Sequence, residues 1–198
     1  MTRVAIVPRW SGDASKDWYP WIRAELGREP GPSLEVQVVD LPNKDAPKID
    51  ACVDALRREL GDDVLALRDT ILVGHSVGCQ ALLHYLAALA PAPAPAPGEA
   101  PPGPRRLLCV AGWWTVDEPW PSIRPWIDAS HDLQRLRANT GGGVTVLLSE
   151  DDPFTSDWRE NQATWERRLD AEVRVIPGGR HFNAAEEPDV LRLVREFL

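Results

Sequence analysis

Several features that would assign this 198-residue chain to a particular class of protein are missing from its sequence. No apolar run approaches the length that crosses a bilayer, and the first residues lack the pattern of a secretory signal. Lys and Arg number 22 against 30 Asp and Glu, so the clustered cations that bind nucleic acid are not expected. We therefore expect one cytoplasmic domain, residues 1–198, that binds neither membranes nor nucleic acid. The net charge of −8 favours solubility and does not identify a substrate.

Cysteine and histidine are also scarce. The three cysteines, Cys52, Cys79 and Cys109, are an odd number in apolar contexts, which predicts reduced core residues rather than disulfides. No group of Cys and His has the spacing of metal ligands, and we expect neither a metal nor an organic cofactor. The histidines available as bases are four in number, namely His75, His84, His131 and His181.

Apolar, β-rich runs alternate with helical patterns along the chain. The predicted strands are residues 3–8, 34–39, 70–73, 106–111, 144–149 and 172–176. The predicted helices are residues 18–27, 49–60, 77–90, 156–170 and 186–198, with a further helical stretch within 123–137. Continuous apolar strands that alternate with amphipathic helices predict an α/β fold, in which helices cover both faces of a parallel sheet. The carboxyl ends of its strands are then the functional edge.

One segment interrupts this alternation. Residues 91–104 are mostly Pro and Ala, a composition that forms neither a helix nor a central strand. Proline-rich ligand segments dock in aromatic grooves, but a tolerated surface insertion is the simpler interpretation, because loops accept insertions at little cost. We therefore expect an extended, solvated surface loop.

The most informative motif is Gly74-His75-Ser76-Val77-Gly78, which stands between an apolar run and a helical pattern. A strand, a sharp Gly-x-Ser-x-Gly turn and a helix form a nucleophile elbow, which presents a serine hydroxyl to a base. The two glycines remove Cβ atoms that would collide where strand and helix pack closely. The alternative is a loop that contains serine by chance, but the flanking elements favour the elbow.

A serine nucleophile needs a base and an orienting carboxylate. His181 follows the last predicted strand in a glycine-rich turn that can fold back over the sheet edge toward Ser76. Asp151 and Asp152 end the strand before it, and only one of them can easily face His181, because alternate side chains on extended backbone point oppositely. Pro153 fixes the direction of Asp152, which makes Asp152 the preferred candidate and leaves Asp151 as the alternative.

The remaining histidines fit other roles. His75 lies inside the elbow and should face away from the position of the base. His84 fits a packed or half-exposed position in the middle of a helix, and His131 fits a surface position in a polar, irregular stretch. His181 is therefore the candidate base.

The oxygen of a substrate carbonyl needs backbone N–H donors in the transition state. One donor should be Val77, the residue after the nucleophile, and the second should come from the loop after the first strand. Pro8 has no N–H, so Arg9 or Trp10 must donate. The side chain of Arg9 has two interpretations, an anion or carboxylate contact near the site and a solvated loop cation.

Tryptophan is unusually frequent, with nine residues. Trp10, Trp113 and Trp114 fall at predicted carboxyl ends of strands, where they can line an apolar substrate pocket. For Trp113 and Trp114, packing is an equally good interpretation. Packing is the preferred role of Trp18, Trp21, Trp126 and Trp165.

With these motifs in place, nearly the whole chain resembles the small α/β-hydrolases of the retinoblastoma-binding-protein-nine and YdeN type. The matching pieces are Asp17-Trp18-Tyr19-Pro20-Trp21, Gly74-His75-Ser76-Val77-Gly78, Arg124-Pro125-Trp126, Asp151-Asp152-Pro153-Phe154 and Gly179-Arg180-His181-Phe182-Asn183. The resemblance implies a lidless three-layer α/β/α sandwich with a six-stranded parallel sheet in the order 2-1-3-4-5-6. It also implies the triad Ser76, Asp152 and His181, because the second aspartate of the Asp-Asp-Pro-Phe tetrapeptide orients the histidine in that family.

Two departures from the family pattern are visible. The first loop reads Val7-Pro8-Arg9-Trp10-Ser11 where many relatives have His-Gly or Pro-Gly, and Arg180 stands between Gly179 and His181. The leading hypothesis is a serine hydrolase that cleaves a small carboxylic ester, thioester or amide through an acyl-enzyme intermediate. The alternatives are an idle hydrolase scaffold that acts as a protein-interaction or ligand-binding module, and an acyltransferase with the same elbow. The sequence does not indicate an oligomeric state.

Overall fold

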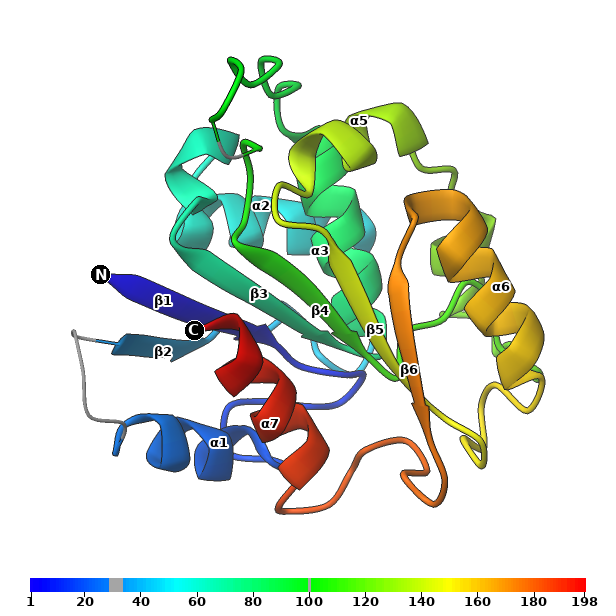
Figure 1. The fold of residues 1–198 in the computed structure, drawn as a ribbon. Coiled ribbons are helices and arrows are strands. Elements are labelled where there is room, and N and C mark those ends of the chain that lie inside the picture. The colour runs from blue at the N-terminus through cyan, green and yellow to red at the C-terminus, as the bar shows by residue number, and fades with distance from the viewer. Residues whose placement is uncertain (29–33, 100) are drawn as a thin grey trace.

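The computed structural model describes residues 1–28, 34–99 and 101–198 of the chain. Six parallel strands form one sheet in the order β2-β1-β3-β4-β5-β6, which confirms the predicted topology (Figure 1). The strands are β1 (Thr2–Val7), β2 (Leu34–Val38), β3 (Thr70–His75), β4 (Arg106–Val110), β5 (Val144–Ser149) and β6 (Glu172–Ile176). The helices are α1 (Tyr19–Leu26), α2 (Ile49–Leu60), α3 (Val77–Ala88), α4 (Arg124–Asp128), α5 (Leu133–Asn139), α6 (Trp158–Leu169) and α7 (Pro188–Phe197), with a 3-10 turn η1 (Val64–Leu67).

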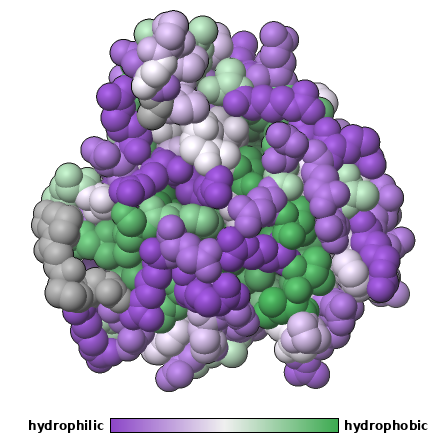
Figure 2. All heavy atoms as spheres, viewed as in Figure 1, coloured by the Kyte–Doolittle hydropathy of each residue, from purple (hydrophilic) through white to green (hydrophobic). Residues whose placement is uncertain are grey.

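Helices cover both faces of the sheet, and each face has its own core. Alternate strand residues such as Val4, Ile6 and Val73 pack with α1 and α7. Residues between them, such as Ala5 and Leu72, pack with α2, α3, α5 and α6 on the other face. The sheet is therefore the middle layer of three, as predicted, and its strands are apolar on both sides because both sides are buried. The face that carries α1 and α7 is mostly hydrophilic, with hydrophobic patches between the polar side chains (Figure 2).

Most predicted elements are present, and their differences from the structure lie at the ends. Strand β3 continues through Gly74 and His75 before the turn, because both residues stay in the parallel ladder with β4. The predicted helical stretch within 123–137 is two short helices, α4 and α5. Helix α7 begins at Pro188, whose missing N–H is tolerated in the first helical turn. The short turn η1 was not predicted.

The Pro- and Ala-rich segment has no regular secondary structure in its described part, as predicted, but it is not wholly solvated. Its last residues, Pro102, Gly103 and Pro104, are buried. The backbone of Gly103 passes so close to Asn139 that a Cβ atom would lie 2.6 Å from the Asn139 carbonyl oxygen. The segment then leads into β4 at its amino end, where the N–H of Arg105 donates to the carbonyl of Thr70 at 2.8 Å. It therefore lies at the opposite end of the strands from the Ser76 turn.

The cysteines behave as predicted. Cys52, Cys79 and Cys109 are buried and free. Among the described residues, every helix falls short of the length and apolar character that a membrane crossing requires.

Candidate active site

Ser76 occupies a strained turn between β3 and α3. Its backbone has φ 54° and ψ −117°, a combination that residues with a side chain rarely adopt. The turn is held by the Ser76 N–H, which donates to the carbonyl of Val110 on the neighbouring strand β4 at 2.9 Å. A Cβ atom on Gly74 would lie 2.7 Å from the backbone of Cys79, and one on Gly78 would lie 2.2 Å from the carbonyl oxygen of Val7. The steric role predicted for both glycines is therefore confirmed.

His181 and Asp152 form a buried pair at the same edge of the sheet. The Nδ1 atom of His181, in the loop after β6, lies 2.8 Å from Oδ2 and 3.1 Å from Oδ1 of Asp152. Asp152 follows β5, and its Oδ1 also accepts the N–H of Phe154 at 2.9 Å, which holds the carboxylate in place. Both side chains are at least nine-tenths buried. This burial favours a directed contact over solvation of either group.

Asp151 points elsewhere. Its Oδ1 accepts the hydroxyl of Ser149 at 2.6 Å and the N–H of Arg180 at 2.9 Å. These hydrogen bonds hold the pKa of the Asp151 carboxyl below its usual range. Asp151 therefore fixes the shape of the histidine loop, and of the two neighbouring aspartates it is Asp152 that contacts the imidazole.

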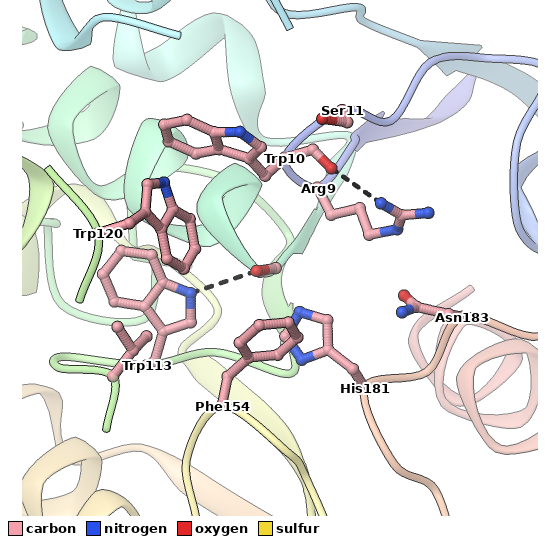
Figure 3. A pocket seen from close by; sticks show the side chains of 10 residues that line it. Arg9, Trp10, Ser11, Trp113, Trp120, Phe154, His181 and Asn183 are labelled. Atoms are coloured by element: carbon pink, nitrogen blue, oxygen red, sulfur yellow. Dashed lines mark hydrogen bonds between the residues drawn. The ribbon is translucent and has the colours of Figure 1, made fainter. Parts of the chain in front are cut away.

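Ser76 and His181 line the same pocket, which opens at the carboxyl end of the sheet. The Ser76 Oγ atom accepts a hydrogen bond from the indole Nε1 of Trp113 at 3.3 Å, the dashed line that leaves Trp113 in Figure 3. Within the described part of the chain, no hydrogen bond joins Ser76 to the His181 ring. Catalytic contacts are often long in a site without substrate and tighten when substrate binds.

The N–H of Arg9 is not available to a substrate, which corrects one of the two predicted donors in the first loop. It donates to the hydroxyl of Tyr19 at 3.0 Å. Farther along the loop, the N–H of Ser11 donates to the carbonyl of Lys44 at 2.9 Å, and the N–H of Gly12 donates to the carbonyl of Arg9 at 2.9 Å.

Two predicted donors stay uncommitted. Across residues 1–28, 34–99 and 101–198, no hydrogen-bond acceptor is seen for the backbone N–H of Trp10 or of Val77. Val77 is the first residue of α3, and the first N–H groups of a helix have no partner within it. Both residues stand beside Ser76, Val77 in sequence and Trp10 in the lining of the pocket.

The side chain of Arg9 makes a carboxylate contact near the site, but to the protein's own Asp17, and the interpretation as a solvated loop cation is wrong. Its guanidinium pairs with the carboxylate of Asp17 through two contacts of 2.7 and 2.9 Å. It also donates to the carbonyl oxygen of Trp10 at 2.8 Å, the second dashed line in Figure 3. Arg9 is therefore neither a solvated cation nor a free anion contact. It closes the first loop on itself and fixes the peptide of Trp10.

A buried hydrogen-bonded network, which sequence reasoning missed, joins the first loop, the elbow and the histidine loop. The hydroxyl of Tyr19, which accepts the N–H of Arg9, lies 2.7 Å from Nδ1 of His75. Nε2 of His75 lies 2.8 Å from the carbonyl oxygen of His181. Burial holds the pKa of His75 well below its usual range, and the nearby His181 lowers it further. His75 is therefore neutral, with Nε2–H as the donor and Nδ1 as the acceptor.

The pocket has a volume of about 230 Å³ and mostly aromatic walls (Figure 3). Its apolar lining consists of Trp10, Trp113, Val116, Trp120 and Phe154. Trp114 does not belong to it, which corrects a predicted pocket residue. The Trp114 ring packs on Trp165 at 4.8 Å, under the guanidinium of Arg168.

Five lining residues had no predicted role, namely Ser11, Val116, Trp120, Phe154 and Asn183. Phe154 and Asn183 had a usable signal, since they follow Asp152 and His181 at a distance of two residues. The Phe154 ring lies edge-on to the imidazole of His181, with centroids 4.6 Å apart.

A family model described as serine hydrolase matches residues 4–191. The chain belongs to the serine hydrolase family. It is 28% identical to the YdeN protein of Bacillus subtilis (strain 168) over 196 residues, which span 99% of this chain and 94% of YdeN. The crystal structure of the ydeN gene product from B. subtilis superposes with a TM-score of 0.78 at 19% identity, covering 100% of this chain and 98% of that one.

Two enzymes of known structure share the fold of this serine hydrolase. A carboxylesterase structure from Nitrososphaera gargenis has a TM-score of 0.68 at 14% identity and covers 99% of this chain and 89% of that one. The thioesterase RedJ from the prodiginine pathway of Streptomyces coelicolor has a TM-score of 0.61 at 18% identity and covers 100% of this chain and 90% of that one. The six-stranded sheet is thus the α/β-hydrolase fold.

His84 and His131 lie together outside the pocket of this serine hydrolase. Their rings stack with centroids 4.2 Å apart, and the Nε2 atoms of both are buried without a hydrogen-bond partner among the described residues. His84 is a half-buried helix residue, as predicted, but His131 is not a plain surface residue. Its ring is packed between His84 and Trp114. The irregular sequence around His131 gave no sign of this packing.

The described residues contain no group of three or more His, Cys, Asp and Glu side chains arranged to hold a metal ion.

Proposed function

We propose that this serine hydrolase cleaves small carboxylic esters, thioesters or amides through an acyl-enzyme intermediate. Ser76 is the nucleophile, His181 the general base and Asp152 the carboxylate that orients His181. The observation that carries the proposal is the buried His181–Asp152 pair, with Nδ1 and Oδ2 2.8 Å apart, in the pocket that also contains the strained Ser76. Acyl transfer needs a nucleophilic hydroxyl, a general base and a carboxylate that orients the base.

In the first step, Ser76 Oγ attacks the carbonyl carbon while its proton passes to Nε2 of His181. The bond to Asp152 uses Nδ1, so Nε2 is the nitrogen left to face the pocket. His181 then gives the proton to the departing alcohol, thiol or amine, which leaves the acyl group on Ser76. Water repeats the sequence, with His181 again as base, and releases the carboxylic acid.

The oxyanion of each tetrahedral intermediate is stabilised by the backbone N–H groups of Val77 and Trp10. Two observations support these donors. Neither N–H has an acceptor in the described structure, whereas the N–H of Arg9 is bonded to Tyr19. The guanidinium of Arg9 also holds the Trp10 peptide by its carbonyl oxygen at 2.8 Å, so the second donor does not depend on glycine in this loop.

The size and lining of the pocket favour a small, uncharged acyl group. At about 30 Å³ per water-sized atom, its volume of about 230 Å³ holds roughly seven heavy atoms. The cation in the lining, Arg9, is already paired with Asp17, so it offers no free charge to an anionic substrate. Aromatic walls favour apolar acyl chains. We therefore expect p-nitrophenyl esters from acetyl to about hexanoyl to be the best substrates of a chain-length series.

Labelling with a fluorophosphonate probe tests the proposal. The native protein should be labelled on Ser76, and Ser76→Ala should fold but take up no label. Full labelling of Ser76→Ala would overturn the role of Ser76. A native protein that is neither labelled nor active on any ester or thioester of the series would support an idle scaffold. Product analysis with competing alcohols or amines would reveal acyl transfer in place of hydrolysis.

A further inference from the structure

The nucleophilic oxygen has a neighbour that the proposed triad does not use. The indole Nε1 of Trp113 lies 3.3 Å from Ser76 Oγ, and the Trp113 side chain is 1% exposed (Figure 3). Indole N–H is a donor only, so the Ser76 oxygen must be the acceptor of this bond. The serine proton is then free to be donated to another group. The contact thus fixes the direction in which the nucleophile presents its proton and its remaining lone pair.

The indole is held in this position by its own backbone. The carbonyl of Trp113 accepts a hydrogen bond from Nε2 of the buried Gln80 on α3. The carbonyl of Gly112 accepts Nδ2 of Asn161 at 2.9 Å and Nε1 of Trp165 at 3.3 Å, both on α6. Side chains from two helices therefore anchor the short segment that carries Trp113. The Ser76 turn is itself bonded to the end of the same strand, β4, so the two groups keep their relative position.

From this geometry we infer that Trp113 is a catalytic residue, whose indole N–H stabilises negative charge on the oxygen of Ser76 during acyl transfer. The inference rests on the proposed role of Ser76 as nucleophile. A tetrahedral serine oxygen has room for its bond to Cβ, its proton and two lone pairs. One lone pair accepts the indole N–H, and the other attacks the carbonyl carbon.

During acylation, the O–H bond of Ser76 breaks and its proton goes to Nε2 of His181, while a lone pair of Oγ forms the new bond to carbon. The π pair of the carbonyl moves to its oxygen and then returns as the leaving group departs with the proton from His181. Trp113 keeps its own proton throughout. It favours the charged form of Oγ on the way in, and again when Oγ leaves the acyl group during hydrolysis.

Trp113→Phe tests the inference, because it removes the N–H and keeps an aromatic wall. The matched control is Trp120→Phe, which makes the same change of ring size in the same pocket, at a ring that has no hydrogen bond to Ser76 in the described structure (Figure 3). For each variant we would measure the second-order rate of inactivation by an ethoxy fluorophosphonate, and kcat and KM for p-nitrophenyl acetate. We expect Trp113→Phe to lower the inactivation rate and kcat by about a hundredfold relative to Trp120→Phe, the lower end of the range for loss of one oxyanion-hole donor.

Inactivation of Trp113→Phe within twofold of Trp120→Phe, or faster than the native protein, would show that the indole is only a wall of the pocket. If Trp113→Phe does not fold, 3-benzothienylalanine at position 113 keeps the ring size and replaces the N–H with sulfur. A loss of rate with this analogue supports the inference, and a native rate overturns it. Ser76→Ala separates the two proposals: continued labelling of that variant rejects the nucleophile itself, whatever Trp113 does.

Discussion

The buried hydroxyl of Tyr19 should contribute to stability far more than a typical tyrosine hydroxyl. It accepts the N–H of Arg9 at 3.0 Å and lies 2.7 Å from Nδ1 of His75, in a core where Tyr19 and His75 are 0% exposed. Burial raises the pKa of Tyr19, so the hydroxyl stays neutral and donates to His75. Tyr19→Phe would leave a backbone donor and a ring acceptor unsatisfied at once.

The magnitude follows from those two lost partners. A buried polar group left without a partner costs about 1–3 kcal/mol, so the two groups together should lower the free energy of unfolding by roughly 2–6 kcal/mol in Tyr19→Phe. For a domain of this size, 1 kcal/mol shifts Tm by roughly 2–4 °C, which predicts a fall of roughly 4–24 °C. Tyr85→Phe is the matched control. Its partly buried hydroxyl donates to one carbonyl, that of Gly61 at 2.9 Å, and its loss should cost about 1 kcal/mol.

Urea and thermal unfolding of the native protein and both variants would measure these differences. Activity below the unfolding range should also fall in Tyr19→Phe, mainly in kcat, because the network positions the loop of Trp10 and the carbonyl of His181. The reasoning would be refuted if Tyr19→Phe were no less stable and no less active than Tyr85→Phe.

Three further predictions follow from the same structure. Gly78→Ala should lower the free energy of unfolding by about 3 kcal/mol or more, because its Cβ would lie 2.2 Å from the Val7 carbonyl oxygen. Gly98→Ala lies in open space and should lower it by about 1 kcal/mol. Thermal unfolding followed by circular dichroism would compare the two variants. Asp152→Asn should lower kcat by roughly 10³–10⁴-fold while Asp151→Asn keeps most activity, and equal losses would contradict the geometry. Burial, together with the charges of His84 and Arg168, lowers the pKa of His131 to about 3, and burial also lowers the pKa of His84. In the unfolded chain His131 binds its proton near pH 6.5, whereas in the folded protein it does so only near pH 3. The stability contributed by neutral His131 is therefore complete above pH 6.5 and falls as the pH drops toward 3, by at most about 1 kcal/mol per pH unit after allowance for partial exposure. In His131→Phe, the free energy of unfolding measured by urea titration should fall less steeply between pH 7 and pH 4 than in the native protein. An unchanged slope would contradict this role of His131.

Local patterns made most of the fold predictable. Strand and helix positions follow from runs of apolar residues, and β5, β6 and α2 were predicted with the bounds that the structure has. The preference for Asp152 over Asp151 was also local, since it came from the alternation of side chains and the proline that follows, and the family resemblance pointed to the same residue. These signals work because the residues that decide them are neighbours in sequence.

The contacts that complete the site were not predictable in this way. Tyr19 and His75 are separated by 56 positions, and His75 and His181 by 106, so no local pattern reports their bonds. Trp113 and Trp114 were indistinguishable because the chain turns at Ala111, where φ is 47°, and the alternation of β4 cannot be extended past that residue. Which indole faces Ser76 is decided by the anchors on α3 and α6, and these become visible only in the folded chain.

The arginine in the first loop shows how a departure from a family pattern can keep the same chemistry. Glycine would let this loop adopt the shape that presents a donor, but it would leave that shape to be selected from many. Arg9 instead holds the loop in one shape. Its N–H donates to Tyr19, and its guanidinium donates to Asp17 and to the Trp10 carbonyl. Each hydrogen bond restricts the loop before substrate arrives, so the donor that we propose, the N–H of Trp10, is preorganised and little ordering cost falls on the transition state. A residue that looks unsuitable by conformational preference alone is therefore suited to this position by its partners.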